Sequence, residues 1–285
     1  MPLIQLKSLL LFLRTLFAVF RNAFIILVSL GLFGDTMTEL LYMDDSYLKE
    51  FNARVARVTD DGIVLDKTVF YPQGGGQPSD TGKIIKYNKE FEVEKVKKVD
   101  GNVIHFLKGE WKDSIKEGDE VKGVINWERR YKLMRMHTAA HVLSSVFNKK
   151  AGALITGNQL DFEKSRFDFN LEDFDREKIL SFVDEVNRLL AEGHEVSISY
   201  LPRDDALKDP ELVKLASVLP PAVKELRIVT IGSIDRQCDG GTHVKNTKEV
   251  GRVVVLKMEN KGKNNRRLYF GLEPPAEQAV EKPTL

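Results

Sequence analysis

The hydrophobic pattern of this chain changes its period near Glu128, and that change limits the possible folds more than any other feature. Between Phe51 and Trp127, apolar and polar residues alternate in runs that end at Asp-Gly, Asn-Lys and Gly-Asp turns. Such alternation is typical of short strands that bury one face. Many short strands with closely spaced turns predict a small β-barrel.

Beyond Glu128 the apolar residues recur at helical spacing, first in 129–150 and again in 176–193. Runs that read as strands lie between and after these helices, at 166–171, 195–201, 226–232, 250–260 and 266–272. Helices combined with strands that must pair at long range predict a two-layer domain. The expected fold class is therefore α+β, with a small N-terminal β-barrel domain followed by a two-layer α/β domain.

The start of the chain has a composition of its own. Its first 34 residues are mainly apolar, and Lys7, Arg14 and Arg21 are their only charged residues. The longest stretch without a charge, Asn22–Gly34, has 13 residues, whereas about 20 apolar residues are needed to cross a bilayer. We therefore favour translation from Met37, with 1–36 as a start-site artefact, over a membrane anchor. A helix that lies in the membrane interface is the reserve interpretation.

These patterns predict four segments along the chain. After the apolar leader 1–36, the barrel domain covers 37–127 and the second domain covers 128–272. The last segment, 273–285, is expected to be a flexible, solvated tail.

The charges nearly balance, with 43 Lys and Arg residues against 42 Asp and Glu residues. No global excess therefore points to a nucleic-acid partner, and any such contact depends on a local patch. The single cysteine, Cys238, excludes an internal disulfide and favours a reducing compartment, so we expect a cytoplasmic protein. We infer no stable protein partner, and membrane association only if the leader is retained.

Two of the five histidines, His137 and His141, are four residues apart in the helix predicted at 129–150. That spacing places them on one face, where two imidazoles can bind one metal ion or simply pack in a core. Far along the chain, Cys238 and His243 lie around a Gly-Gly turn. Imidazole and thiolate are the donors that zinc prefers, so the two segments together favour a metal site. Thr138 follows the first histidine, so the HExxH protease signature is absent.

Four stretches together resemble a known family. HTAAH, with the downstream Cys/Gly-Gly-Thr-His segment, resembles the editing domain of alanyl-tRNA synthetase and the free-standing AlaX editing proteins. FYPQGGGQPSDTG (70–82) is similar to the glycine-rich motif of that family. GNQLDFEKSRFDF (157–169) and MENKGKNNRRLYF (258–270) are similar to its editing-domain stretch and closing hairpin. The likeness runs from Met37 to about Leu272 and best fits the medium-length type, in which a barrel precedes the editing domain.

The resemblance implies one zinc ion per chain in an editing domain at 128–272, with His137, His141 and His243 as ligands. The second half-site of the family is Cys-x-x-x-His, with its cysteine four residues before the histidine. That position is Asp239 here, and Cys238 lies one residue earlier. We place Cys238 ahead as the fourth ligand for its softness, with Asp239 or water as the alternatives.

The resemblance further implies trans-editing, the hydrolysis of mischarged Ser-tRNA(Ala), with Gly-tRNA(Ala) as a second candidate substrate. A pocket sized for alanine rejects glycine weakly and excludes serine imperfectly, so a second sieve is needed. A zinc-bound water is the expected nucleophile, fixing the substrate is an open second role for the ion, and no side chain is assigned as a base. Two alternatives stay open, namely editing of Ser-tRNA(Thr) and a non-catalytic, metal-stabilised tRNA-binding module.

Candidate substrate-binding residues come from two segments. Thr156 and Gln159 can read the serine hydroxyl or hold the ester, with local turn bonding as the alternative. On physical grounds the glycine-rich segment 70–82 is a tight turn beside a strand, with a backbone nest for phosphate as the rival. The resemblance adds that Gln77 and Asp80 face the editing site.

Contact with mischarged tRNA(Ala), the expected partner, needs local positive charge. Between Lys257 and Arg267, five cationic side chains stand against one carboxylate. Such clusters bind phosphates without reading the base sequence, and a solvated hairpin is the alternative. A second basic group lies at the start of the first predicted helix and contains Arg129, Arg130, Lys132 and Arg135. The predicted tRNA-binding residues are Lys261, Lys263, Arg266 and Arg267.

Overall fold

The structure is a computed structural model that describes residues 37–172, 175–206, 208–209, 212, 224–262, 264–273 and 275. The described residues from Thr38 onward belong to one compact unit and form a strand-rich α+β fold, which confirms the predicted fold class. The leader 1–36, Lys263 and nearly all of the tail after Glu273 lie outside the described residues. The division into two domains near Glu128 falls inside this one unit and stays a prediction.

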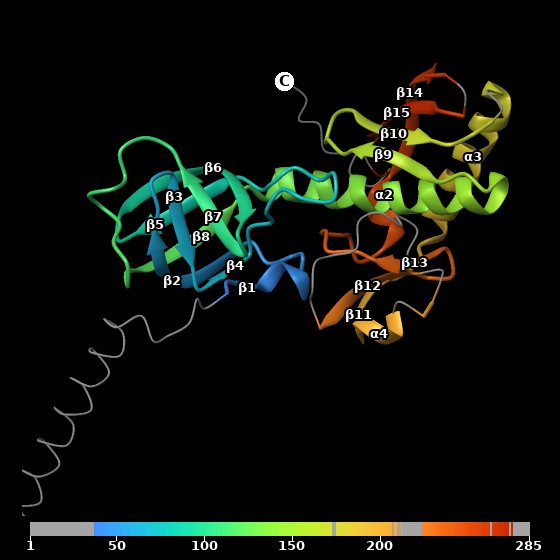
Figure 1. The fold of residues 1–285 in the computed structure, drawn as a ribbon. Helices are drawn as coiled ribbons and strands as arrows, with labels where there is room; N and C mark the ends of the chain where they lie inside the picture. Colours follow the sequence, from blue (N-terminus) through green and yellow to red (C-terminus); the bar gives the residue numbers. More distant parts are fainter. Residues whose placement is uncertain are drawn as a thin grey trace, which may run out of the picture. The chain divides into compact units, whose positions relative to one another are not determined.

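Six antiparallel strands close into a barrel (Figure 1). In order around the barrel they are β2 (Glu50–Val58), β3 (Gly62–Leu65), β7 (Asn102–Leu107), β6 (Lys89–Val99), β5 (Gly82–Lys86) and β8 (Glu120–Ile125). Burial alternates along β2, with Phe51, Ala53 and Val55 inside, as the period of two requires. The barrel predicted from this alternation is confirmed. Two short strands, β1 (Glu39–Leu40) and β4 (Lys67–Thr68), pair in parallel and flank a 3-10 turn, η1 (Leu41–Met43).

A long helix, α2 (Trp127–Ala151), follows the barrel and confirms the first predicted helix. It begins at Asn126, whose side chain accepts a hydrogen bond from the Arg129 N–H, and ends at Gly152 in the left-handed conformation. Between 133 and 147 nearly every residue is buried, on all sides of the helix. A helix that is buried all round lies at the centre of a fold, so the polar side chains of α2 are buried as well.

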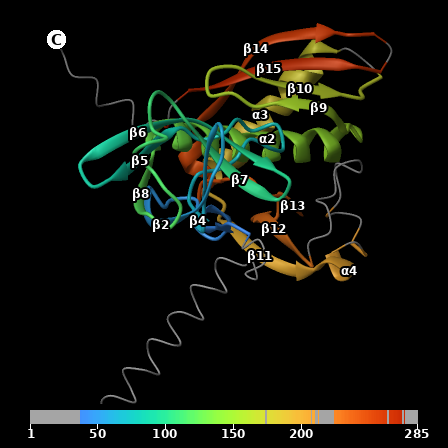
Figure 2. The same ribbon diagram turned by 60° about the vertical axis from the view of Figure 1, so that its left-hand side comes forward.

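Two sheets lie on opposite sides of α2 in both ribbon views (Figures 1 and 2). One has four antiparallel strands in the order β14 (Arg252–Asn260), β15 (Arg266–Glu273), β10 (Ser165–Phe169) and β9 (Ile155–Gln159). The other has three, in the order β11 (Val196–Pro202), β12 (Glu225–Ile231) and β13 (Asp235–Cys238). The hydrophobic pattern does not predict β9 and β13 as strands, because both are short and mainly polar.

A second helix, α3 (Arg176–Glu192), packs beside α2 and β14 and confirms the second predicted helix. Its buried face carries Ile179, Phe182, Val183, Val186 and Leu190. These residues join one apolar core with α2, the four-stranded sheet and β12. Two short segments, α4 (Arg203–Ala206) and η3 (Thr247–Val250), complete the described elements. None of the described helices combines the length and the apolar character needed to cross a bilayer.

A buried ion pair joins the first turn of α2 to the barrel. The guanidinium of Arg130 donates from Nε to both carboxylate oxygens of Asp80, at 3.1 and 3.0 Å, and both side chains are fully buried. It also donates to the carbonyl oxygens of Ser46 and Val69, at 2.8 and 2.5 Å. Asp80 accepts a further hydrogen bond from the Tyr71 N–H at 2.7 Å. We call this buried ion pair, with the hydrogen bonds around it, the clamp. Both of its charges, on Arg130 and Asp80, are compensated inside the protein.

This clamp predicts a large loss of stability when one partner is removed. We expect Arg130→Ala to lower the free energy of unfolding by about 3–5 kcal/mol, because it leaves the Asp80 carboxylate buried without its cation. Lys132→Ala is the matched control, since it breaks an exposed pair with Glu128 on the same helix and costs less than about 1 kcal/mol. Urea titration measures both values, and an equal effect of the two substitutions would contradict the role of the clamp.

Candidate metal centre

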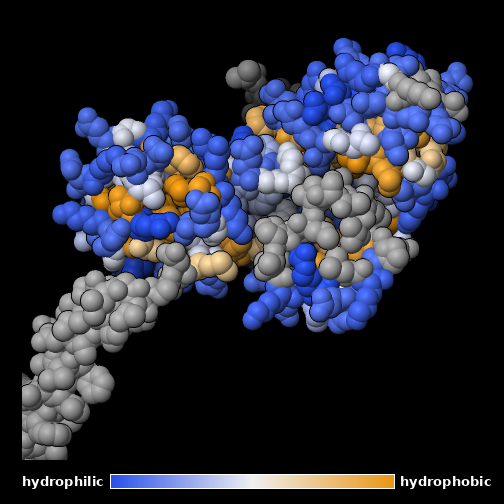
Figure 3. Space-filling view, in the orientation of Figure 1, coloured by the Kyte–Doolittle hydropathy of each residue, from blue (hydrophilic) through white to orange (hydrophobic). Residues whose placement is uncertain are grey.

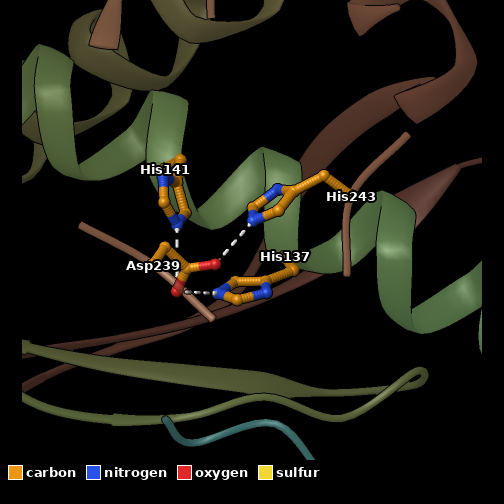
Figure 4. A group of neighbouring side chains, drawn as sticks. All are labelled: His137, His141, Asp239 and His243. Carbon is orange, nitrogen blue, oxygen red and sulfur yellow. Dashed lines mark hydrogen bonds and ion pairs between the residues drawn. The ribbon is translucent and has the colours of Figure 1, made fainter. Parts of the chain in front are cut away.

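Four side chains that can bind a metal ion meet at α2, namely His137, His141, Asp239 and His243 (Figure 4). One donor atom from each lies within 4.8 Å of the others. The first two histidines come from successive turns of α2, whereas Asp239 and His243 follow β13. The three histidines are only 5%, 6% and 3% exposed. The fold thus brings together the two segments that the sequence singles out, although they are far apart along the chain.

The three imidazoles present their Nε2 atoms to the carboxylate of Asp239. Oδ2 of Asp239 lies 2.9 Å from His243 Nε2, while Oδ1 lies 3.6 Å from His137 Nε2 and 3.9 Å from His141 Nε2. The rings of His137 and His243 stack, with their centroids 4.4 Å apart. Nitrogen atoms that converge in this way suit chelation of a single ion.

The outer nitrogen atoms of two imidazoles are held by neighbouring side chains. Nδ1 of His141 lies 3.0 Å from the buried carboxylate of Asp235 and 2.7 Å from the amide nitrogen of Gln237. Nδ1 of His243 lies 3.1 Å from the hydroxyl of Thr138. Partners of this kind fix the orientation of metal-binding imidazoles.

Burial favours the neutral form of two of these imidazoles, those of His137 and His243. It lowers the pKa of His137 well below the usual value, and the neighbouring His243 lowers it further although Asp239 acts in the opposite direction. Burial also lowers the pKa of His243 to about 4, although its hydrogen bond to the Asp239 carboxylate acts to raise this pKa. A metal ion binds imidazole only in its neutral form, so this environment prepares the rings for binding.

The carboxylate of Asp239 is held as an anion. Burial acts to raise its pKa, but the contacts with His137 and His243 outweigh burial and hold the pKa well below the usual value. The Gly241 N–H donates to Oδ2 at 2.7 Å, and the Arg227 guanidinium donates to the backbone oxygen of Asp239 at 2.8 Å. Asp239 is therefore an oriented, ionised donor beside three imidazoles.

Cys238 lies outside this group, which differs from the preference given to it as the fourth ligand. It is the last residue of β13, where successive side chains point to opposite faces of the sheet. Its half-buried side chain packs against the apolar cluster that contains Leu226 and Ile228, and burial raises the pKa of its thiol. A thiol with a raised pKa is a poor metal donor at neutral pH. The next residue, Asp239, faces the histidines instead.

A glycine lets the loop after β13 approach the helix. A Cβ atom on Gly241 would lie 2.1 Å from Cε1 and 2.3 Å from Nδ1 of His137, whereas a Cβ on Gly240 would meet nothing within 4 Å. The ring of His137 therefore packs directly on the backbone of Gly241. This contact explains why only the second glycine of the Gly-Gly turn is required by geometry.

The donor set fits a borderline transition metal such as zinc. Three imidazole nitrogens and one carboxylate oxygen are accepted zinc ligands, and their number matches a tetrahedral site. Sequence spacing does not indicate the supporting residues Asp235, Gln237 and Arg227. Gln237 donates from its amide to Asp235 at 2.7 Å, and Arg227 comes from β12. No spacing rule links these residues to the histidines, because they reach the centre only through sheet pairing.

Comparison with known proteins places this geometry in a family. Residues 36–129 match the model for class II (A) tRNA synthetases, and residues 226–269 match the model for the second additional domain of threonyl and alanyl tRNA synthetases. An alanyl-tRNA editing protein AlaX-M from Methanosarcina barkeri is 49% identical over 241 residues, which cover 83% of this chain and 99% of that protein. The chain belongs to the AlaX-M family of alanyl-tRNA editing proteins.

Two other relatives agree with this assignment. The AlaX-M protein from Saccharolobus solfataricus is 44% identical over 240 residues, or 84% of this chain and 100% of that protein. An alanine–tRNA ligase from Thermoplasma acidophilum is 37% identical over 242 residues, or 84% of this chain but 27% of that enzyme. The family resemblance read from the sequence motifs is thus confirmed.

The glycine-rich segment of this AlaX-M chain contains the predicted tight turn. Gly74 and Gln77 exchange two backbone hydrogen bonds, at 3.1 and 2.8 Å. The buried side chain of Gln77 donates from its amide to the hydroxyl of Thr242 at 3.0 Å, directly beside His243 in the chain. Asp80, in contrast, is consumed by the clamp with Arg130, so it does not face the substrate as the resemblance implied. Its two oxygens have no exposed surface to offer.

Thr156 and Gln159 lie on β9 and are both exposed. Within the described part of the chain, neither side chain makes a hydrogen bond with the histidine group. They are accessible to a ligand, and their role as substrate-binding residues stays a proposal.

The basic hairpin of β14 and β15 lies in a region that Figure 3 shows as mainly hydrophilic. Lys261 pairs with Glu259 at 2.8 Å, and Arg267 pairs with Asp168 at 2.6 Å. Arg266 is 6% exposed and donates to Asn260 and to backbone oxygens of the hairpin, so it differs from the exposed cation that was expected. Lys263 lies outside the described residues.

The contact between His137 and Gly241 predicts a specific defect. We expect Gly241→Ala to weaken metal binding by about 10–100-fold, because the added methyl group displaces the ring of a ligand. Gly240→Ala is the matched control and should bind metal as the wild type does. Zinc titration in competition with a coloured chelator measures both affinities. Equal affinities for the two variants would show that the ring does not depend on this close approach.

The position of Asp239 predicts which neighbour completes the metal centre. We expect Asp239→Ala to lose most of its bound metal, whereas Cys238→Ala keeps the wild-type content, because only the carboxylate faces the histidines. Elemental analysis after dialysis gives the metal content per chain. Loss of metal in Cys238→Ala with retention in Asp239→Ala would reverse this assignment.

Proposed function

We propose that this chain is a trans-editing hydrolase that removes serine from mischarged Ser-tRNA(Ala). The observation that carries the proposal is the buried group of three imidazoles and one carboxylate, in a chain whose relatives are named alanyl-tRNA editing proteins. The reaction is hydrolysis of the ester that joins the amino acid to the terminal ribose. Gly-tRNA(Ala) is a second substrate of the same site, because a smaller amino acid also fits.

We further propose that one zinc ion per chain binds to His137, His141, Asp239 and His243. The fit rests on neutral rings, convergent Nε2 atoms and the ionised carboxylate. A zinc ion bound there supplies Lewis-acid polarisation of an ester carbonyl or of water. Asp235 and Gln237 hold the ring of His141 through Nδ1, and Thr138 holds the ring of His243.

The remaining residues of the site position the substrate. The amide of Gln77 is fixed by Thr242, so the glycine-rich loop is held beside the metal centre. We assign reading of the serine hydroxyl to Thr156 and Gln159, which are exposed on β9. Alanine has no hydroxyl and would leave such polar groups without partners, which favours release of a correctly charged tRNA. Arg227 lies behind Asp239, donates to its backbone oxygen and lies 3.8 Å from its carboxylate.

Ser-tRNA(Thr) is the second candidate substrate. The model that matches residues 226–269 covers the second additional domain of both threonyl and alanyl tRNA synthetases. The matched alanine–tRNA ligase and the AlaX-M relatives support the alanyl branch as the first choice.

A deacylation assay tests this function. The zinc-loaded chain should hydrolyse Ser-tRNA(Ala) faster than Ala-tRNA(Ala) and Ser-tRNA(Thr). We expect His137→Ala to lower the rate by at least about 100-fold, because loss of a ligand removes several kcal/mol of transition-state stabilisation. Cys238→Ala, the matched control, should keep the wild-type rate.

Each contrary result has its own meaning. Preferred hydrolysis of Ser-tRNA(Thr) would move the chain to the threonyl branch. No hydrolysis of any of the three tRNAs by the zinc-loaded chain would leave a metal-stabilised tRNA-binding module and reject the enzyme. An unchanged rate in His137→Ala would remove the metal from the mechanism.

A further inference from the structure

A polar pocket of about 580 Å³ lies between the glycine-rich loop and the strands β9 and β10. The barrel contributes Lys97 and Lys98 from the end of β6, and the sheet contributes Arg166 from β10. Its size falls in the usual range of binding pockets, roughly 300–1,000 Å³. The pocket is distinct from the four metal-binding side chains, none of which lines it.

The charge of this pocket is positive and uncompensated. Three cationic side chains line it, and none of its lining residues is a carboxylate. Within the described part of the chain, Lys97, Lys98 and Arg166 form no ion pair. The Nε atom of Arg166 is buried and has no hydrogen-bond partner among the described residues. A buried guanidinium nitrogen without a partner is costly, so this side chain is prepared for an acceptor from outside.

The basic hairpin offers the opposite case. Lys257 and Lys261 both pair with Glu259, at 2.5 and 2.8 Å, and Arg267 pairs with Asp168. Carboxylates therefore compensate the charges of these three side chains, and Arg266 is buried. An anionic ligand therefore meets a stronger field at the pocket than at the hairpin.

Primary amides add neutral hydrogen-bonding groups to the cations of the pocket. Gln73 and Asn158 line it beside the cations, and a primary amide offers both donors and acceptors. Such groups match the base edges and ribose hydroxyls of unpaired RNA, whereas a free phosphate would need only the cations. Gln77 also lines the pocket, and its amide is bonded to Thr242 beside His243. One side chain thus connects the pocket to the metal centre.

The walls of the pocket are fixed from both sides. The Leu160 N–H donates to the Gly76 carbonyl at 2.9 Å, and the amide of Asn158 donates to the Gly75 carbonyl at 3.2 Å. Gly76 has a φ of +85°, and a Cβ atom there would lie 2.5 Å from Oδ1 of Asn158. On the barrel side, the Gln73 N–H donates to the Val96 carbonyl at 3.0 Å. The glycines therefore allow the loop to lie directly against β9, and these hydrogen bonds fix the walls of the pocket.

We propose that this pocket binds the single-stranded 3′ end of the tRNA, with Lys97, Lys98 and Arg166 on its phosphates and the amides on its bases or riboses. The assignment rests on the proposed function, since it places the strand that carries the aminoacyl ester next to the metal centre. It also moves the principal backbone contact from the hairpin, where the sequence placed it, to the junction of barrel and sheet.

Salt dependence of RNA binding tests the pocket. The probe is an uncharged RNA hairpin with a single-stranded 3′ tail, compared with the same hairpin without the tail, and affinity is measured at several salt concentrations. Each phosphate contact in a single strand contributes about 0.7 to the slope of log affinity against log salt. The combined substitutions Lys97→Ala, Lys98→Ala and Arg166→Ala should lower this slope by about 2 for the tailed RNA only.

The matched control is Lys257→Ala with Lys261→Ala on the hairpin, which should keep the wild-type slope. Should Arg166→Ala fail to fold, the pair Lys97→Ala and Lys98→Ala on exposed positions still predicts a decrease of about 1.4. With Ser-tRNA(Ala), the pocket variants should raise KM and keep kcat. An unchanged slope in the pocket variants, or an equal decrease with the tailless RNA, would overturn the proposal.

Failure of the two proposals is distinguishable, because the binding probe carries no amino acid. If the wild-type chain hydrolyses no aminoacyl-tRNA but the pocket variants show a smaller salt dependence of RNA affinity, the RNA site is supported and the editing function is rejected. If the wild-type chain hydrolyses Ser-tRNA(Ala) but the pocket variants keep the wild-type salt dependence of RNA affinity, the editing function is supported and this RNA site is rejected.

Discussion

The buried ion pair between Arg130 and Asp80 is the interaction on which the remaining geometry depends. It fixes the first turn of α2 to the barrel, and the helix then carries His137 about 10 Å further along its axis. On the barrel side, Asp80 stands three residues after Gln77, whose amide reaches Thr242 beside His243. The clamp therefore sets the distance between the glycine-rich loop and the metal centre. A rigid helix with one anchored end transmits that position to His137 and His141.

Burial explains why the metal centre has its chemistry. α2 is enclosed on all sides, so its two histidines are desolvated, and burial lowers the pKa of His137 well below the usual value, which keeps a lone pair available to an ion. The same enclosure makes an isolated carboxylate costly, and Asp239 is tolerated because a backbone N–H, Arg227 and the imidazoles surround it. A cation fits such an acceptor-rich set better than another neutral group does. The same reasoning applies to RNA, which is an anion. The cations of the hairpin are paired with carboxylates, whereas among the described residues those of the pocket are not, so the pocket is the better binding site for phosphates.

Several features could be predicted from the sequence because they depend on local pattern. The period of two is visible in β2 and the other barrel strands, and the helical period locates α2 and α3 to within a few residues. β9 and β13 were not predicted, because short polar strands have no hydrophobic pattern of their own and form only by pairing with β10 and β12. Asp80 was expected to face the editing site and Arg266 to bind tRNA, since a charged residue in a sequence carries no sign of the partner that buries it.

By itself, the sequence determined that His137 and His141 share one helix face and that a second segment near His243 is their natural counterpart. Only the tertiary structure decided that Asp239, rather than Cys238, meets them. Adjacent residues of a strand point to opposite faces, so the choice depends on which face of β13 is turned toward α2, and that follows from sheet pairing over long range. The pocket at Lys97, Lys98 and Arg166 has the same origin, because its walls come from the barrel and from β9 and β10, which only folding places side by side.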